Sequence, residues 1–438
     1  MNPRELAEEA AQALHGIAWY GQRKPVFTGS NAVTLLKRGS EQFAAMCERI
    51  DQASQSVWMA TYMVSPHGQS GLVLQAMMQA ARRGVKVYFV VDGVGSREAP
   101  ASLWLEMAQA GVQLAIYRPL HGLLSPLDTA QWRRMHMKLC VVDARVAFVG
   151  GINLIDDRYD LTHGWTANPR LDYALEVQGA VVMPVAHTIK AMWTRATLGR
   201  DWRDDIEHWL GDRNRMKRLR TLWKKSRLRL PASTQDRQAT SAAARAPMRC
   251  AFVLRDNLLQ RRTIERAALQ AIQQARTRVD IVTPYFYPAR ALRHALHDAA
   301  RRGVRVRLLL QGKVDYKIAA MAARVLYGEL QQHGVRIHEY QPAFLHAKVV
   351  CVDEDWATVG SSNLDPMSLV LNLEANLVVR DIGFLQTLTA ALEADFGESV
   401  EVPLPAVLDR TWAMRVRRSV VAWMAKVYLR LGGVTGRY

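Results

Sequence analysis

The chain has 438 residues, of which 49% are hydrophobic, so a disordered protein is excluded and two domains with cores of their own can form. The formal net charge of +18 favours an anionic partner, either nucleic acid or a phospholipid surface. The four cysteines form no CxxC pair and no zinc spacing, which fits a reducing cytosol. We expect no signal peptide, because the N-terminus carries acids early and has no apolar h-region. We also expect no membrane-spanning helix, because no apolar run reaches roughly 18 residues.

The first half of the chain alternates between helix and strand patterns. Residues 1–24 form an N-terminal extension to which we assign no chemistry. The segments that follow are, in order, a helix around Phe43–Ile50, a strand over 57–64, a helix over 72–84, a strand over 85–93, a helix ending at Gln109 and an apolar segment over 110–119. This alternation predicts the α/β class of fold.

The same order returns in the second half. Residues 80–87 read AARRGVKV and residues 299–306 read AARRGVRV, and residues 110–119 and 333–342 match in the same way. The repeat therefore covers whole domains and not only a motif. We expect two tandem α/β domains, over residues 25–200 and 249–400, related by a pseudo-twofold axis.

Two segments have a different composition. Residues 201–248 form a basic segment and a linker, with nine Lys or Arg and no acid over 213–229. This basic segment is either a solvated helix face or a patch attracted to an anionic surface. Residues 401–438 form a basic amphipathic tail, either docked on the core of the protein or lying at a membrane interface. We favour the interface, because tryptophan and arginine interleave there.

One short pattern occurs once in each half. Residues 136–153 read HMKLCVVDARVAFVGGIN and residues 346–363 read HAKVVCVDEDWATVGSSN. In both, a histidine is followed by lysine at position +2, aspartate at +7, glycine at +14 and asparagine at +17. Five specified positions at fixed offsets in two copies indicate a functional site where the copies meet.

The side chains of this pattern suit chemistry on a phosphodiester. Residues two apart in a strand share a face, so each histidine projects beside its lysine. One imidazole can attack phosphorus while the other transfers the proton of the leaving or entering hydroxyl. The lysines and asparagines can hold the non-bridging oxygens as charge builds, a role that a metal often has. No cluster of carboxylates and histidines suits a metal, so we expect no metal.

Four carboxylates accompany the pattern. Asp143 and Asp353 lie seven residues after the histidines, so in a strand they would face the opposite side. Both also fall at an expected turn, and we infer that they support the hairpin. A nucleophilic histidine also needs a carboxylate at its second nitrogen. Asp172 and Glu374 each lie in an otherwise apolar strand, and we propose them as the orienting groups.

The doubled His-x-Lys-x4-Asp pattern resembles the signature of the phospholipase D superfamily, over about residues 30–400. Residues 299–312 and 356–379 are most similar to bacterial cardiolipin synthases of the short type without N-terminal transmembrane helices. The resemblance implies two phospholipase D-like α/β/α sandwiches with a shared site, His136 as nucleophile and His346 as acid and base. One departure is Gly151, where the second copy has Ser361, so that the two halves of the site differ. The predicted site residues are His136, Lys138, Asp143, His346, Lys348 and Asp353 for catalysis, Asn153 and Asn363 for phosphate binding, and Asp172 and Glu374 for histidine orientation.

We therefore expect a cardiolipin synthase-like phosphatidyltransferase. It would move a phosphatidyl group from phosphatidylglycerol to a second phospholipid hydroxyl through a phosphohistidine, without a cofactor. A hydrolytic phospholipase D or a phospholipase D-type nuclease could use the same site, and a non-catalytic binder of anionic surfaces is a third hypothesis. The expected partners are phosphatidylglycerol, cardiolipin and a membrane surface rather than nucleic acid, and the expected location is peripheral, on the cytoplasmic side of the bacterial cell membrane.

Overall fold

The structure is a computed structural model. It describes residues 25–119, 133–161, 163–198, 248–256, 260, 262–313, 317–363 and 372–404, and for 317–323 and 325 the backbone alone. The predicted N-terminal extension, the basic segment over 213–229 and nearly all of the amphipathic tail lie outside the described residues. What was predicted for them stays a prediction.

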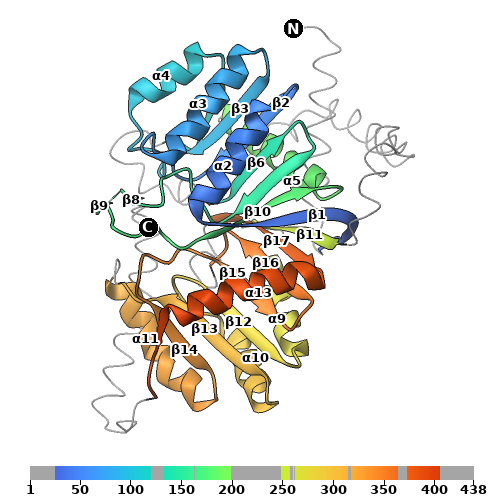
Figure 1. Ribbon diagram of the computed structural model, residues 1–438, viewed down its shortest axis with the longest axis vertical. Coiled ribbons are helices and arrows are strands. Elements are labelled where there is room, and N and C mark those ends of the chain that lie inside the picture. The colour runs from blue at the N-terminus through green and yellow to red at the C-terminus, as the bar shows by residue number, and fades with distance from the viewer. Residues whose placement is uncertain are drawn as a thin grey trace, which may run out of the picture.

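The first half builds a seven-stranded part of a sheet with helices on its faces (Figure 1). Its elements are β1 (Thr28–Lys37), α2 (Arg38–Asp51), β2 (Ser56–Thr61), α3 (Gln69–Arg82), β3 (Lys86–Asp92), α4 (Ala101–Gln109), β4 (Gln113–Tyr117), the short β5 (Arg134–Met135), β6 (Lys138–Val142), β7 (Val146–Gly150), the hairpin of β8 (Tyr159–Asp160) and β9 (Gly164–Trp165), β10 (Tyr173–Gln178) and α5 (Val182–Leu198).

The second half repeats this order. Its elements are β11 (Met248–Arg255), α9 (Thr263–Gln274), β12 (Arg278–Val282), α10 (Arg290–Arg301), β13 (Arg305–Gln311), α11 (Lys317–Gln332), β14 (Arg336–Tyr340), β15 (Val349–Val352), β16 (Trp356–Gly360), β17 (Asn372–Arg380), α13 (Ile382–Gly397) and β18 (Ser399–Glu401). The predicted α/β class and the duplication of a whole domain are therefore confirmed.

The strands of both halves join in one mixed sheet of 16 strands. Its order is β18-β14-β13-β12-β15-β16-β17-β11-β1-β10-β7-β6-β2-β3-β4, so that equivalent strands lie at equal distances from the β11–β1 pair. This central pair is antiparallel, with Thr28 opposite Cys250 and Asn31 opposite Met248. Antiparallel pairing of two equivalent strands is the arrangement that a pseudo-twofold axis produces.

The strand at the centre of the molecule is one that the sequence pattern does not predict. No element is predicted from the sequence over residues 25–42. In the structure β1 (Thr28–Lys37) lies there and pairs with β10 on one side and β11 on the other. Its buried positions include the polar Asn31, and its register with β11 shifts between Thr28 and Asn31. A polar buried position and a bulge both obscure the period of two by which a strand is recognised.

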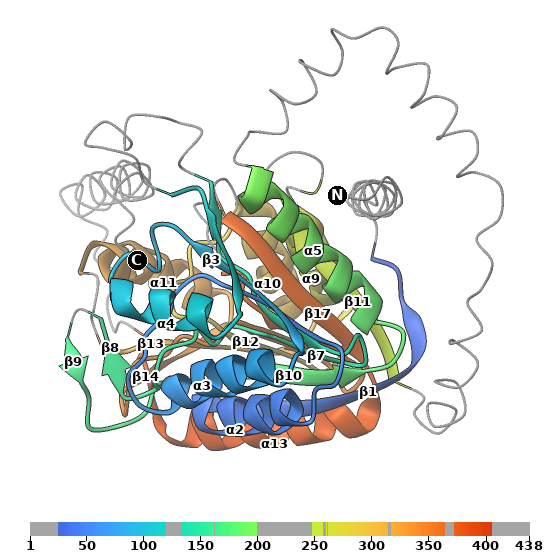
Figure 2. The ribbon, with the colours of Figure 1, turned by 90° about the horizontal axis from the view of Figure 1, so that it is seen from above.

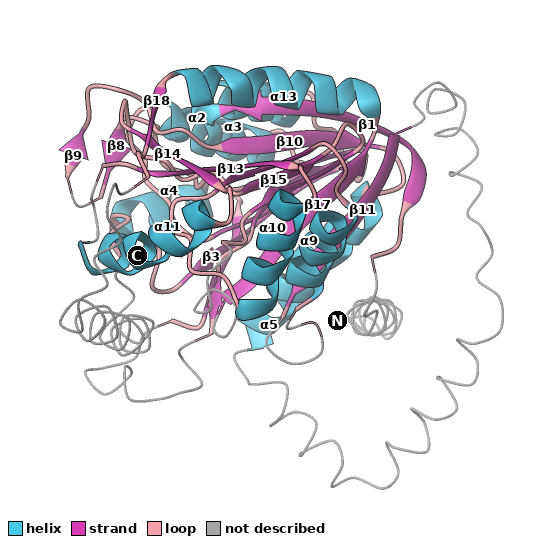
Figure 3. Cartoon of the chain, turned by 90° about the horizontal axis from the view of Figure 1, so that it is seen from below, coloured by secondary structure: helices cyan, strands magenta, loops and turns pink. Residues whose placement is uncertain are grey.

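Helices lie on both sides of the sheet, with α2, α3 and α13 on one side and α5, α9 and α10 on the other (Figures 2 and 3). In α2 the apolar face is formed by Phe43, Met46 and Ile50, at the spacing of an amphipathic helix. α9 and α10 cover the corresponding face of the second half.

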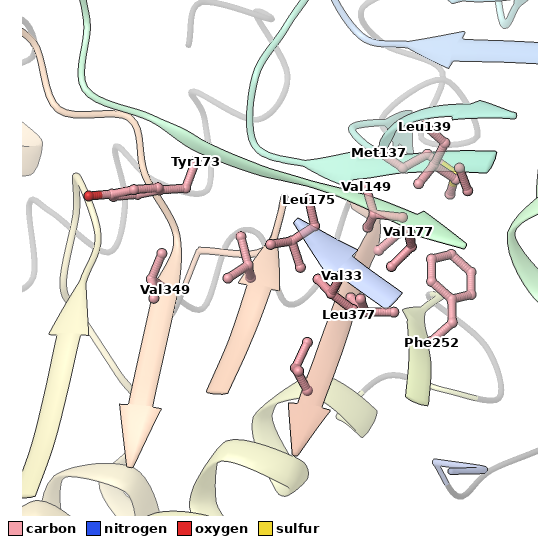
Figure 4. Packing of buried hydrophobic residues seen from close by; sticks show 14 of the residues in the cluster. Val33, Met137, Leu139, Val149, Tyr173, Leu175, Val177, Phe252, Val349 and Leu377 are labelled. Carbon is pink, nitrogen blue, oxygen red and sulfur yellow. The ribbon is translucent and has the colours of Figure 1, made fainter. Parts of the chain in front are cut away.

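The shared core combines buried residues from both halves, including Leu139 and Val149 of the first and Val349 and Leu377 of the second (Figure 4). α5 and α13 add their apolar faces to this same core. Because one continuous core joins the halves, residues far apart in the sequence are held in fixed positions across the junction.

Candidate active site

The two copies of the motif form matching hairpins, β6–β7 in the first half and β15–β16 in the second. His136 and Lys138 lie at the entry of β6, and His346 and Lys348 lie just before β15. His136, Lys138 and Lys348 are buried, and His346 is half-buried. The exposed fraction of the side chain is 11% for His136 and 28% for His346. The predicted histidine–lysine pairs are thus located at equivalent positions of the two half-sheets.

Each histidine is hydrogen-bonded to a carboxylate of the other half. The Nδ1–H of His136 donates to Glu374, with 3.1 Å to each carboxylate oxygen. The Nδ1–H of His346 donates to Oδ2 of Asp172 at 2.6 Å. These contacts cross 238 and 174 residues of sequence, respectively. Both rings are left with Nε2 for a ligand, as a nucleophile or a proton carrier requires.

The backbone explains why the pairs cross. The segment before His136 forms β5, which pairs in parallel with the start of β17, and the N–H of His136 donates to the carbonyl of Leu373 at 3.0 Å. In the other half Leu345 pairs in parallel with Leu171, and the N–H of His346 donates to the carbonyl of Leu171 at 2.8 Å. Each histidine is therefore attached to the strand that carries its carboxylate, one residue away.

The two lysines lie beside the histidines with their ammonium groups inside the protein. The Lys138 Nζ donates to the carbonyl of His136 at 2.6 Å and lies 5.4 Å from the ring centre of Tyr62. The Lys348 Nζ donates in the same way to the carbonyl of His346. Burial lowers the pKa of Lys138 to about 7, with the nearby Lys348 charge adding to the effect. The charges of Lys138 and Lys348 act on each other, so an anion near both ammonium groups would be favoured.

The pKa values of both imidazoles are lowered, which favours their neutral forms. Burial lowers the pKa of His136 to about 4, although Glu374 acts in the opposite direction. Burial and then the charges of Lys348 and Lys138 lower the pKa of His346 well below its ordinary value. The charge of His136 also contributes to the lowered pKa of His346, so the two rings share one electrostatic site. A neutral imidazole is the form that attacks phosphorus or accepts a proton.

The two asparagines retain hydrogen-bonding capacity. Asn153 is buried and Asn363 is half-buried, and Oδ1 of each is enclosed without a hydrogen-bond partner among the described residues. A buried amide without a partner is uncommon, since leaving one unpaired costs about 1–3 kcal/mol. This is consistent with the predicted contact between the carboxamides and a ligand.

The two motif aspartates lie apart from this cluster. Asp143 follows the far end of β6 and accepts the backbone N–H groups of Ser54, Gln55 and Ser56 at 2.8 Å each. Asp353 accepts the N–H groups of residues 276–278 in the same manner. Both have a left-handed backbone with φ of 51°. Asp143 and Asp353, predicted among the catalytic residues, contact the turn of the neighbouring chain segment and not the histidines.

The comparison with protein families settles the relationship of this chain. The family described as "Cardiolipin synthase, PLD-like domain" matches twice, over residues 46–164 and 268–396. "Cardiolipin synthase B" of Salmonella typhi is 37% identical over 399 residues, which cover 90% of this chain and 87% of the relative. The chain belongs to the cardiolipin synthases of the phospholipase D superfamily. The predicted membership and the predicted enzyme class, a phosphatidyltransferase, are confirmed.

Two further comparisons agree with this cardiolipin synthase assignment. "Cardiolipin synthase B" of Escherichia coli K12 is 34% identical over 400 residues, which cover 90% of this chain and 87% of the relative. The crystal structure of phosphatidylserine synthase from Haemophilus influenzae Rd KW20 covers 97% of this chain and 98% of its own, with a TM-score of 0.58 and 14% identity. The latter likeness shows the fold, two phospholipase D-like domains in one continuous sheet.

Three contacts of this cardiolipin synthase site were not anticipated from the sequence. The Arg255 guanidinium lies 3.5 Å from Glu374, and the Ser361 hydroxyl donates to Glu374 at 2.5 Å. The Tyr62 ring packs edge-on against His136, with 5.0 Å between ring centroids. Ser361 follows the motif glycine and was noted as a difference between the copies. Arg255 and Tyr62 lie outside both copies, and no local pattern distinguishes them from other strand-end residues.

Metal-binding clusters and membrane-spanning helices are both lacking among the described residues. No group of three or more His, Cys, Asp or Glu there is arranged to hold a metal ion. Of the helices that the structure describes, none has the length and apolar character needed to cross a bilayer. The predicted independence from metal therefore stays a prediction.

Proposed function

We propose that this enzyme transfers a phosphatidyl group from phosphatidylglycerol to the hydroxyl of a second phospholipid, through a phosphohistidine on His136. The observation that supports this most is the crossed pairing of His136 with Glu374 and His346 with Asp172 in one electrostatic site. Two oriented imidazoles are the minimum that a double displacement on phosphorus needs: one to form the covalent bond and one to transfer the proton.

In the first step Nε2 of His136 attacks phosphorus, and the bond between phosphorus and the glycerol oxygen breaks. An anionic phosphodiester next to His346 stabilises the protonated imidazole, and His346 then gives its proton to the departing glycerol oxygen. In the second step neutral His346 takes the proton of the incoming lipid hydroxyl. The oxygen of that hydroxyl attacks phosphorus, and the bond between phosphorus and His136 breaks.

Lys138, Lys348, Asn153 and Asn363 bind the non-bridging oxygens in this proposal. Negative charge on these oxygens grows in the transition state, and buried donors that are already in place stabilise it without reorganisation. Burial of the two ammonium groups is the feature that makes them effective, because an ion pair is stronger away from water. The activity is therefore expected to survive a strong chelator.

We further propose that the enzyme binds anionic membrane surfaces peripherally, on the cytoplasmic side of the bacterial cell membrane. Its substrates are phospholipids, and its net charge of +18 favours anionic headgroups. Co-sedimentation with phosphatidylglycerol vesicles, falling as salt is added, is the expected result. Equal binding to phosphatidylcholine vesicles would contradict the proposal.

The direct test is incubation of the purified enzyme with phosphatidylglycerol vesicles, followed by analysis of the lipid extract. Cardiolipin and free glycerol in equal amounts are expected. Phosphatidic acid in place of cardiolipin would show that water is the acceptor and that the enzyme is a hydrolase. A search for nuclease activity with single-stranded and double-stranded DNA should give no product that depends on His136.

The roles of the two histidines can be separated with phosphatidyl-p-nitrophenol, whose leaving group needs no proton. His346→Ala is expected to retain the burst of p-nitrophenol and to accumulate an acid-labile phosphoenzyme. His136→Ala is expected to give neither. The reverse result would exchange the two roles.

A further inference from the structure

The two carboxylates that orient the histidines have different surroundings. The carboxylate of Glu374 accepts a hydrogen bond from the Ser361 hydroxyl at 2.5 Å and lies 3.5 Å from the Arg255 guanidinium. Asp172 has His346 at 2.6 Å and the N–H of its neighbour Tyr173 at 2.8 Å. Glu374 thus has an arginine at ion-pair distance, and among the described residues Asp172 has none at a comparable distance.

The strand registers identify the residue equivalent to Arg255. In the second half Arg255 lies opposite Glu374 in the β11–β17 pair. In the first half the β1–β10 pair places Lys37 opposite Tyr173, and the next residue, Arg38, donates its backbone N–H to the carbonyl of Asp172 at 2.8 Å. Arg38 is therefore the equivalent of Arg255.

The two equivalent arginines point to different partners. The Arg38 guanidinium acts on the phenol of Tyr340, where it lowers a pKa that burial raises. Arg255 instead lies against Glu374 and donates from NH1 to the Ser362 hydroxyl at 3.0 Å. Arg38 and Arg255 are therefore the same residue type at equivalent positions, but their guanidinium groups contact different partners.

Arg255 has no access to substrate. Its side chain and that of Glu374 are both 0% exposed, so neither group is reached from solvent. A buried guanidinium acts on the groups that it contacts, and for Arg255 these include Glu374 and the Ser362 hydroxyl.

We propose that Arg255 is a positioning residue that keeps Glu374 anionic against His136, and that the two histidines are unequal because, among the described residues, no arginine makes such a close ion pair with Asp172. This inference rests on the proposed function, in which His136 is the nucleophile. An anionic carboxylate holds the Nδ1–H of His136 and increases the nucleophilicity of its Nε2. The histidine whose carboxylate has no such cation is left with the proton-transfer role.

The electrostatics of the site agree with this assignment. Burial raises the pKa of Glu374, but His136 and then Arg255 and Lys138 together hold it below its ordinary value. Burial raises the pKa of Asp172 to about 7, although Lys348, the N–H of Tyr173, Lys138 and the more distant Arg170 act against it. The groups facing Glu374 are His136, Lys138, Arg255 and Ser361, and of these only Arg255 lies on β11.

The experiment measures the pH dependence of kcat/KM for release of p-nitrophenol from phosphatidyl-p-nitrophenol by the full-length enzyme. Replacing Arg255 with Gln removes a cation from Glu374 and raises the pKa of that carboxylate. The acid side of the profile is therefore expected to move up by about 1–3 pH units. Arg255→Lys retains the charge and is expected to restore most of the wild-type profile.

Two further variants keep the test decisive. Ser362→Ala removes only the hydroxyl that Arg255 donates to, and a smaller shift in the same direction is expected even if Arg255→Gln fails to fold. Arg38→Gln is the matched control at the equivalent position and should leave the acid side unmoved. An unchanged profile in Ser362→Ala and in any folded Arg255 variant, or an equal shift in Arg38→Gln, would overturn the inference. Because p-nitrophenol release needs no lipid acceptor, this outcome is independent of whether the enzyme makes cardiolipin.

Discussion

His136 and His346 hold equivalent positions in two repeated halves, but single residues around them differ. At position 151 the first half has glycine, and a Cβ built there would lie 2.5 Å from Oδ1 of Asp172. The second half has Ser361 at the equivalent position, and its hydroxyl donates to Glu374. The glycine leaves room for one carboxylate, and the serine supplies a hydrogen bond to the other.

Replacing Gly151 with Ser is therefore expected to displace the carboxylate of Asp172 from His346. Misplacement of a catalytic group by about 1 Å can cost roughly a hundredfold in rate, so turnover of phosphatidylglycerol should fall by about that factor. Ser361→Gly is the matched control, since it removes a hydroxyl without intruding on Glu374, and it should cost less. A fully active Gly151→Ser enzyme would show that the position of Asp172 is not important.

The two carboxylates are also expected to affect stability with opposite dependence on pH. Burial raises the pKa of Asp172 to about 7, so the folded protein binds a proton there that the unfolded chain has lost, and stability falls as pH rises from about 4 to 7. The pKa of Glu374 is lowered, so its stabilisation is present above the ordinary pKa and is lost as pH falls.

Thermal melts of Asp172→Asn and Glu374→Gln between pH 4 and 8 measure this difference. Relative to wild type, Asp172→Asn should become more stable as pH rises, by roughly 1–4 kcal/mol, and Glu374→Gln should become less stable. Parallel curves for wild type and both variants would show that neither carboxylate has a shifted pKa.

At the scale of elements, each motif hairpin has a histidine and a lysine at one end and an aspartate at the other. Asp143 and Asp353 end the first strand of their hairpins and accept backbone N–H groups that begin the neighbouring strand, β2 or β12. A carboxylate that accepts several backbone N–H groups fixes two strands in register. The hairpin thereby positions the histidine and lysine at its opposite end.

Asp143→Ala is accordingly expected to lower stability and to leave chemistry almost unchanged. Loss of the acceptor leaves the N–H groups of residues 54–56 without this partner, which should cost about 1–3 kcal/mol. Chemical denaturation measures that loss, and kcat of the folded fraction should stay within a few-fold of wild type. Asp353→Ala should behave alike, and a loss of kcat without a loss of stability in either variant would assign these aspartates to catalysis.

At the scale of the whole molecule, the site exists only where the two halves meet. Each histidine is oriented by the opposite half, and a single core with residues of both halves lies beneath them. The β1–β11 pair makes one sheet of the two halves. Neither half by itself contains both His136 and Glu374, or both His346 and Asp172.

Expression of the chain as two pieces, cut between residues 230 and 231, tests this dependence. Each piece alone should release no p-nitrophenol from phosphatidyl-p-nitrophenol, and the two pieces expressed together should recover activity by pairing through β1 and β11. Activity from either piece alone would contradict the crossed arrangement. Full-length His136→Ala provides the background rate.

The sequence by itself determined the α/β class and the duplication, and it predicted the set of site histidines, lysines, asparagines and carboxylates, because each is recorded in local spacing or in a repeat of it. It did not reveal β1 as the central strand, since a buried polar residue and a bulge obscure its pattern. Which carboxylate serves which histidine, and where the two equivalent arginines point, were decided only by the tertiary structure. These contacts form between strands that are distant in sequence, and the packing of one shared core brings them together.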